Sequence, residues 1–334
     1  MDTRRRDAQP SNSEMSEQSP TKLIVGTRGS ELALVQATAT EAALAAAFPH
    51  LTIERKVIKT TGDRRTDVSL SEVAKSEGTF DKGVFIKEIE EALHAGEIDI
   101  AVHSLKDLPT TLQNRYRLAA TLERAPVRDV LVMRQPGGLD ALPQGARVGT
   151  SSVRRAKQIQ WLRPDLQVSD LRGNVPTRMR KLSEEDHHDA ILLAEAGLVR
   201  LGFIPEFSDN DAASEPVGGL PGLHLTRLPE GDFFPAAGQG AIALEVRTGD
   251  APSLVYAEAI GHRETWLRIT AEREFLRLLD GGCHTPVGVY SSMDGDEITL
   301  KARVFPDEGG TPKSGEARGT DPLTLALELF NSLS

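Results

Sequence analysis

The sequence predicts an α/β protein of two doubly wound lobes followed by a small C-terminal α+β domain. Three observations lead to this fold class. Short apolar runs alternate with helical patterns along most of the chain, which is typical of parallel sheets covered by helices. A β-branched run, Gly-Thr and then a serine at a helix start occur twice, at residues 24–30 and 147–152. After residue 285 the pattern changes to alternating strands and a final helix.

The composition is that of a globular protein with room for more than one core. Of 334 residues, 39% are hydrophobic and 26% are charged. A single cysteine excludes an intramolecular disulfide framework and favours a reducing compartment. No apolar run reaches the roughly 18 residues of a membrane span. Residues 1–20 mix acids and arginines, so we expect a disordered tail, not a secretory signal, and a cytoplasmic protein.

The first lobe begins with a predicted strand at residues 23–25, a loop that contains Arg28 and Ser30, and a helix over residues 31–48. Ser30 is suited to cap this helix, and the free amides behind it favour an anion. Alone this signal is weak, because most such loops are only tight turns. A strand at residues 51–58, an irregular region and an amphipathic helix at residues 84–93 follow.

The next strand, at residues 98–102, runs directly into the polar segment 103–109. Ligands of open α/β sheets bind beyond the carboxyl ends of strands, so His103, Ser104, Lys106 and Asp107 are well placed for chemistry. A carboxylate with cations nearby can stay ionised in a dry cleft. The local sequence supports equally well a capped turn that stops at a proline.

The second lobe begins with a strand near residues 128–134 and carries arginines close behind the ends of its later strands: Arg154, Arg155, Arg172, Arg178 and Arg200. In a doubly wound sheet these strand ends share one edge, so we expect the side chains to converge. The planar fork of arginine suits carboxylates and phosphates. The pattern predicts a polyanionic ligand.

The charge distribution points the same way. Residues 147–181 hold nine basic side chains and two acids, a local charge of +7 in a chain whose net charge is −10. The net charge argues against a general nucleic-acid binder. The basic segment indicates an anionic ligand, although a solvated basic helix face is the more usual meaning of a charge run.

The last third of the chain holds a glycine- and proline-rich segment at residues 207–234, which is predicted to be a loop insertion. Small residues around Gly238 and Gly240 suit a hinge before a strand that ends at residue 246. From about residue 261 we expect a long helix, strands at residues 287–290 and 298–304, and a helix from about residue 323.

Cys283 lies on a loop just past the long helix, where the helix dipole disfavours a thiolate. A small buried side chain is the usual role of a lone cysteine. The alternative is a point of covalent attachment, and the neighbouring residues do not decide between the two.

Six motifs stand in a fixed order: Gly-Thr-Arg-Gly-Ser at residues 26–30, Asp-Ile-Ala-Val-His-Ser-Leu-Lys-Asp-Leu-Pro at 99–109, Val-Gly-Thr-Ser-Ser-Val-Arg-Arg at 148–155, Leu-Arg-Gly-Asn-Val at 171–175, Ala-Gly-Gln-Gly-Ala at 237–241 and Gly-Gly-Cys at 281–283. Together they resemble the motifs of the hydroxymethylbilane synthase (porphobilinogen deaminase) family over residues 23–334. The resemblance implies lobes like those of type II periplasmic binding proteins.

The resemblance also implies a transferase of tetrapyrrole (porphyrin and haem) biosynthesis. This enzyme condenses four porphobilinogen molecules head to tail into hydroxymethylbilane and releases four ammonia molecules. It implies a dipyrromethane cofactor held by a thioether to Cys283, Asp107 as the catalytic carboxylate, and no metal. Matching positions imply binding roles in cofactor and substrate recognition for Arg28, Ser30, Lys82, Phe85, Ser104, Lys106, Ser152, Arg154, Arg155, Arg172, Arg178, Arg200 and Gln239.

One segment departs from the family pattern. Residues 75–85 are longer than the compact Lys-x-Gly-Gly-Lys-Gly-Leu-Phe of the family, although Lys82 and Phe85 still align. Lys75 is the least secure match.

We expect four parts: a tail at residues 1–20, a first lobe at 21–124 with 241–258, a second lobe at 128–235 and a third domain at 263–334. The protein would be a monomer that binds porphobilinogen and neither nucleic acid nor a membrane. A non-enzymatic receptor for an anionic small molecule is the alternative, since this fold mostly binds solutes. The motifs around Asp107 and Cys283 disfavour it.

Overall fold

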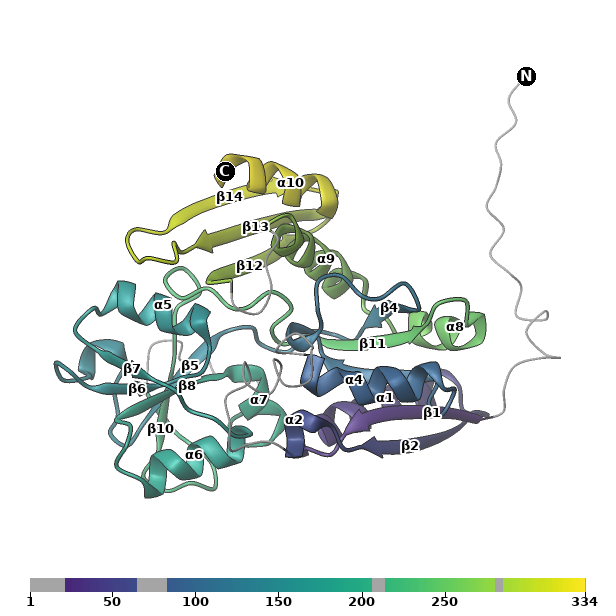
Figure 1. The fold of residues 1–334 in the computed structure, drawn as a ribbon, viewed down its shortest axis with the longest axis horizontal. Coiled ribbons are helices and arrows are strands. Elements are labelled where there is room, and N and C mark those ends of the chain that lie inside the picture. Colours follow the sequence, from purple (N-terminus) through teal and green to yellow (C-terminus); the bar gives the residue numbers. More distant parts are fainter. Residues whose placement is uncertain (1–21, 65–82, 206–213, 280–284, 334) are drawn as a thin grey trace.

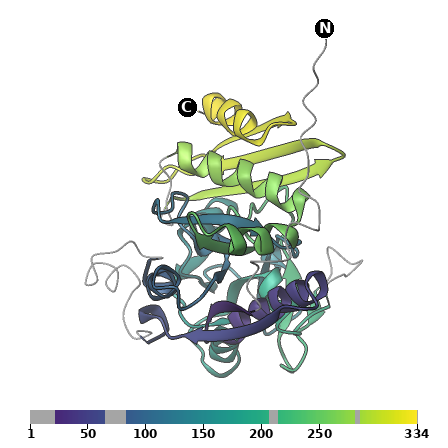
Figure 2. The same cartoon turned by 90° about the vertical axis from the view of Figure 1, so that its right-hand side faces the viewer.

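The computed structural model describes residues 22–64, 83–205, 214–279 and 285–333 and organises them around three sheets. Figure 1 shows two α/β lobes side by side, with a smaller C-terminal unit in yellow and green above them. Figure 2 shows the same unit stacked over the lobes in a view turned by 90°. The predicted fold class, two α/β lobes and a small C-terminal α+β domain, is confirmed.

The first lobe has a mixed sheet whose strands lie in the order β2 (Thr52–Ile58), β1 (Lys22–Arg28), β3 (Ile100–Ser104), β11 (Ile242–Arg247) and β4 (Tyr116–Thr121). β1 is parallel to β2 and β3, whereas β11 runs antiparallel to both of its neighbours. Because β11 follows the second lobe in the chain, the polypeptide crosses between the lobes twice.

Helices cover this sheet: α1 (Glu31–Ala47), α2 (Thr61–Arg64), α4 (Gly83–His94) and α8 (Ala251–Ala259). α1 begins where the sequence predicts, because the Ser30 hydroxyl accepts a hydrogen bond from the amide of Ala33 and satisfies one free donor of the first turn. A core cluster joins Leu244 of the sheet to Leu44 of α1 and Tyr256 of α8.

The second lobe has strands in the order β7 (Gln167–Ser169), β6 (Arg147–Gly149), β8 (Ala190–Ala194), β5 (Asp129–Met133), β10 (His224–Arg227) and β9 (Glu215–Pro216). β6 is parallel to β7 and β8, and β5 runs antiparallel to β8. Its helices are α5 (Val153–Leu162), α6 (Val175–Glu184), α7 (Glu195–Arg200) and the 3-10 turn η2 (Leu139–Ala141).

The prediction of a loop insertion at residues 207–234 is wrong for part of this segment. Residues 206–213 lie outside the described residues, but β9 and β10 follow them, and β10 pairs with β5 along its whole length. Leu225 and Arg227 of β10 are buried. A four-residue strand flanked by glycines and prolines is too short to show alternation, so its pairing with β5 identifies it only in the folded chain.

The C-terminal unit packs α9 (Arg263–Leu278) and α10 (Pro322–Leu333) against an antiparallel sheet of β12 (Val287–Asp294), β13 (Glu297–Val304) and β14 (Lys313–Gly319). β14 is not predicted from the sequence, because Lys-Ser-Gly-Glu-Ala-Arg-Gly holds no β-branched residue. Its backbone pairs with β13 from Lys313 to Gly319. None of the helices in the described ranges is long and apolar enough to cross a membrane.

His103 corrects a further expectation. β3 extends to Ser104, so His103 belongs to the strand and not to the polar loop behind it. It pairs with Ala243 of β11, and its buried ring places Nε2 3.1 Å from Oε2 of Glu245. We therefore assign His103 to the core of the first lobe.

Candidate functional site

Lys106 and Asp107 lie on a single turn, η1 (Leu105–Asp107), directly after β3. The turn is held from both ends: the amide of Leu105 donates to the carbonyl of Ala241, and the side chains of Leu105 and Leu108 are buried. Gly238 has φ 71°, and a Cβ there would lie 2.8 Å from Cγ of Leu105. The two polar side chains between these apolar anchors are half-buried.

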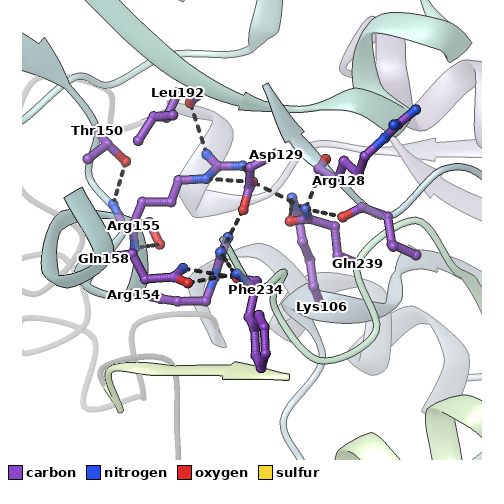
Figure 3. A network of polar contacts seen from close by, with 12 residues as sticks. Lys106, Arg128, Asp129, Thr150, Arg154, Arg155, Gln158, Leu192, Phe234 and Gln239 are labelled. Carbon is purple, nitrogen blue, oxygen red and sulfur yellow. Dashed lines mark hydrogen bonds and ion pairs between the residues drawn. The ribbon is translucent and has the colours of Figure 1, made fainter. Parts of the chain in front are cut away.

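A fully buried carboxylate, Asp129, lies at the start of β5 and forms ion pairs with the first two arginines of α5 (Figure 3). Its Oδ2 accepts from Nη1 of Arg154 at 2.6 Å, and its Oδ1 accepts from Nε and Nη2 of Arg155 at 2.9 and 2.6 Å. Burial alone would raise the pKa of Asp129, but the charges and hydrogen bonds of the two arginines hold it well below its usual range. Asp129 therefore stays ionised.

Gln239 connects this carboxylate to the first lobe (Figure 3). Its Nε2 donates to the carbonyl of Val127 at 2.7 Å and to Oδ1 of Asp129 at 3.2 Å, while its Oε1 accepts from Nζ of Lys106 at 3.4 Å. The side chain is fully buried. Its backbone carbonyl accepts from Arg124. One glutamine thus bridges the polar groups that follow β3 and those that precede β5.

The cations at this junction crowd one another. Burial first, and then the charge of Arg155, lower the pKa of Lys106 to about 8, although Asp107 and Asp129 offset part of the effect. Burial and Arg155 likewise lower the pKa of Arg178 to about 10, against the charges of Asp170 and Asp107. A bound anion would relieve both groups.

Arg172 and Arg178 follow β7 on the same side of the second lobe. Nε of Arg178 donates to the carbonyl of Gly173 at 2.7 Å. Nη1 of Arg172 is buried and has no hydrogen-bond partner among the described residues. Arg172 lines a pocket of about 370 Å³ together with Ser169, Asp170, Leu171, Lys181, Glu185, His187 and His188. An unpaired buried guanidinium donor favours an acceptor from a ligand or water.

The three predicted serines all have structural partners. Ser30 caps α1, and Ser152 caps α5 by accepting from the amide of Arg155 at 3.4 Å. Ser104 exchanges hydrogen bonds with the side-chain amide of Gln36 at 2.9 and 3.2 Å. Because capping occupies only an acceptor lone pair, the hydroxyls of the two capping serines keep a proton to donate.

Two further arginines were predicted to bind the ligand, Arg28 and Arg200. Arg28 is half-buried at the end of β1. Arg200 ends α7, and its Nη2 donates to the carbonyl of Gly240 at 2.7 Å. Arg200 therefore ties the second lobe to the turn that enters β11.

Several predicted residues cannot be placed. Lys82 and Cys283 lie outside the described residues, as does Lys75, and the structure describes only the backbone of Phe85, within α4. Their predicted roles stay predictions.

The basic segment 147–181 does not act as one unit. Arg147 bonds to Asp186 and Asp189, and Arg163 bonds to Asp165 at the lobe's own surface. Arg154 and Arg155 turn inward to Asp129. The interpretation of the whole segment as an anion site is therefore too broad.

Asp129 is not among the residues predicted from the sequence, although the sequence carries a signal for it. An aspartate that opens a wholly apolar strand, Val130 to Met133, must either face solvent or find cations, and Asp129 is fully buried. Around the junction, four cations (Lys106, Arg154, Arg155 and Arg178) accompany two carboxylates (Asp107 and Asp129). The geometry can therefore bind acidic groups beside Asp107, to which none of the described arginines donates a hydrogen bond.

Two family models match the chain. The model described as "Porphobilinogen deaminase, dipyromethane cofactor binding domain" covers residues 23–254, and "Porphobilinogen deaminase, C-terminal domain" covers residues 266–334. Porphobilinogen deaminase of Roseiflexus sp. (strain RS-1) is 44% identical over 314 residues, 93% of this chain and 95% of that protein. The protein of the same name from Nitrobacter winogradskyi is 46% identical over 289 residues, 85% of this chain and 83% of the relative.

Two solved structures have a distant similarity to this chain. The methionine-binding protein MetQ has a TM-score of 0.42 at 11% identity and covers 74% of this chain and 92% of its own. A VFT2 domain of Bordetella pertussis BvgS has a TM-score of 0.41 at 15% identity, and the match covers 75% of this chain and 93% of that domain. Such scores say nothing of activity or ligand. The sequence matches carry the assignment: the chain belongs to the porphobilinogen deaminase family.

Proposed function

We propose that this protein condenses four porphobilinogen molecules head to tail into hydroxymethylbilane, with release of four ammonia molecules. The observation that carries the proposal is the group of crowded cations where the lobes meet. Each porphobilinogen brings an acetate and a propionate. The lowered pKa values of Lys106 and Arg178 mean that a carboxylate bound there stabilises their charged forms.

The residues at the junction fit a dipyrromethane cofactor. This group is rich in carboxylates, and Lys106, Arg154, Arg155 and Arg178 are cationic, while Arg172 has a buried donor without a described partner. Cys283 would hold the cofactor covalently. When bound, the cofactor supplies the pyrrole carbon to which the first substrate is joined.

Asp107 would carry the chemistry. It is half-buried, and its charge offsets part of the lowering of the pKa of Lys106 and Arg178, so a carboxylate and two cations share one region. Positive charge develops on the pyrrole as ammonia leaves, and a nearby fixed carboxylate stabilises it. The same carboxylate can accept a proton from the ring and return it. Lys106 and the arginines would orient the acidic side chains of the substrate.

Mass spectrometry of the intact protein tests this function. The purified protein should exceed its sequence mass by one dipyrromethane, and stepwise additions should follow incubation with porphobilinogen. A fully active protein without added mass would contradict the cofactor assignment. Binding of porphobilinogen without turnover would favour the receptor alternative.

Other features remain proposals. A monomeric, cytoplasmic protein without nucleic-acid or membrane partners is supported by the net charge of −10 and the single cysteine. The domain bounds 21–124 with 241–258, 128–235 and 263–334 are supported by the pairing of β11 with β3 and β4.

A hinge near Gly238 and Gly240 would have to move tightly packed backbone, because a Cβ at Gly240 would lie 2.5 Å from the carbonyl oxygen of Ala125. Scattering profiles of loaded intermediates would test that motion.

A further inference from the structure

Phe234 lies between the second lobe and the C-terminal unit, and Gln158 of α5 holds both of its backbone polar groups (Figure 3). Nε2 of Gln158 donates to the carbonyl of Phe234 at 2.9 Å, and the amide of Phe234 donates to Oε1 at 2.7 Å. The glutamine is fully buried. Its side-chain amide therefore satisfies the backbone donor and acceptor of Phe234, a residue that lies outside the helices and strands.

Arg154 shares the same carbonyl. It lies one helical turn before Gln158, on the same face of α5, and its Nη1 donates to Phe234 at 2.6 Å as well as to Asp129. The position of Phe234 thus helps to orient a guanidinium at the candidate site. Gln158 itself lies one step away from that site.

The other side of this segment contacts the C-terminal sheet. The amide of Val289 in β12 donates to the carbonyl of Pro235 at 2.8 Å. Gly288 leaves no room, because a Cβ there would lie 2.5 Å from Cβ of Phe234 and 3.0 Å from its carbonyl oxygen. From β13, Arg303 donates to the carbonyl of Asp232 and places its guanidinium 4.4 Å from the centroid of the Phe234 ring. In sequence, β12 begins at the fourth residue after Cys283.

We propose that Gln158 is a positioning residue: by holding Phe234, it sets the place of β12 relative to Arg154. The inference rests on the proposed function, since β12 follows the cysteine to which the cofactor would be attached. Gln158 touches neither substrate nor cofactor. It acts by keeping two parts of the site in register, and small misplacements of reacting groups slow a reaction severely.

Two variants test the inference from opposite sides. Gln158→Met keeps the length of the side chain and removes both hydrogen bonds, and Gly288→Ala pushes on Phe234 from β12. Gln160→Met, exposed on the same helix, is the control for the first. Gly315→Ala is the control for the second, because its Cβ would crowd Leu329 and Leu333 at 3.0 Å but not Phe234.

The measurements are kcat and KM of the full-length holoprotein for porphobilinogen, hydrogen exchange at the Phe234 and Val289 amides, and intact mass. We expect both test variants to lose roughly tenfold or more in kcat, with KM changed less than about threefold, because the remaining cations still bind substrate. Both amides should exchange faster. The two controls should match the unaltered protein.

Different results overturn different statements. If the unaltered protein is active and both test variants keep its kcat, the positioning role is wrong, even if the variants melt at lower temperature. Unchanged exchange at Val289 in Gln158→Met would equally refute the coupling. Absence of turnover and of added mass in the unaltered protein would overturn the proposed function, and this inference with it.

Discussion

The two lobes share one strand order yet place different carboxylates behind the equivalent strand. In the order β2-β1-β3-β11-β4, Asp107 follows β3; in the order β7-β6-β8-β5-β10, Glu195 follows β8. Glu195 is fully buried and accepts from Arg128 and Arg227, its contact with Arg227 being 2.5 Å. Asp107 is half-buried, and none of the described arginines donates a hydrogen bond to it.

The fold places a carboxylate after the equivalent strand of each lobe. The neighbouring side chains then determine whether that carboxylate is held in ion pairs or can bind a ligand. A carboxylate clamped by two arginines is neutralised and stabilises the lobe only while the clamp is complete. A carboxylate beside cations but without a clamp keeps lone pairs for a ligand. Ser30 and Ser152 also occupy equivalent positions in the two lobes, because each caps the N-terminus of a helix, α1 and α5 respectively.

The largest expected effect is a loss of turnover at Asp107, the carboxylate to which none of the described arginines donates a hydrogen bond. Asp107→Asn removes the charge with little change in shape, so kcat should fall about 100-fold or more. The melting temperature should stay close to that of the unaltered protein. Steady-state kinetics and thermal unfolding check both statements, and near-normal turnover would remove Asp107 from the chemistry.

For Glu195→Gln we expect the opposite result, a loss of stability with turnover retained. It removes the buried carboxylate that Arg128 and Arg227 share, although Arg227 keeps its ion pair with Glu215, and Nη2 of Arg227 already has no partner among the described residues. Loss of one member of a buried ion pair costs about 3–5 kcal/mol in the free energy of unfolding. Denaturant unfolding measures the loss. Glu215→Gln, at the more exposed end of the network, is the control and should cost less. Unchanged stability with lost turnover would mean that Glu195 is catalytic.

The lowered pKa of Lys106 predicts that both activity and stability depend on pH. Its pKa of about 8 lies below the ordinary 10.5, so the free protein loses this cation as the pH rises through about 8. We expect kcat/KM to fall over that range and the fall to move to higher pH in Lys106→Arg. Since the folded pKa is the lower one, the stability penalty of charged Lys106 should disappear between about pH 8 and 10.5 in ligand-free protein. A pH profile identical in Lys106→Arg would assign the fall to another group.

The smallest effect is expected at Arg147, which belongs to the same basic segment but bonds to Asp186 and Asp189 near the surface. Exposed ion pairs contribute little to stability. Arg147→Gln should therefore leave cofactor content, kcat and the melting temperature nearly unchanged. A clear loss of bound cofactor would return Arg147 to the ligand site.

Local pattern was enough for most elements and not for all. The helix from Ser30 is predictable, since a capping serine and an apolar run act over one turn. β10 and β14 are not, because four residues at 224–227 and the polar stretch at 313–319 become strands only by pairing with β5 and β13. His103 is similar: its pairing with β11 takes it out of the predicted loop.

The family, the fold class and the residue types at the junction can be inferred from the sequence, because they depend on motifs that keep a fixed order along the chain. Which charges pair depends on the folded protein. Asp129 meets Arg154 and Arg155 across a sheet edge, and Gln239 joins Asp129 to Lys106 across more than a hundred residues of chain. Such contacts depend on how two sheets share a crossing chain, and burial then turns each pairing into a large effect on charge.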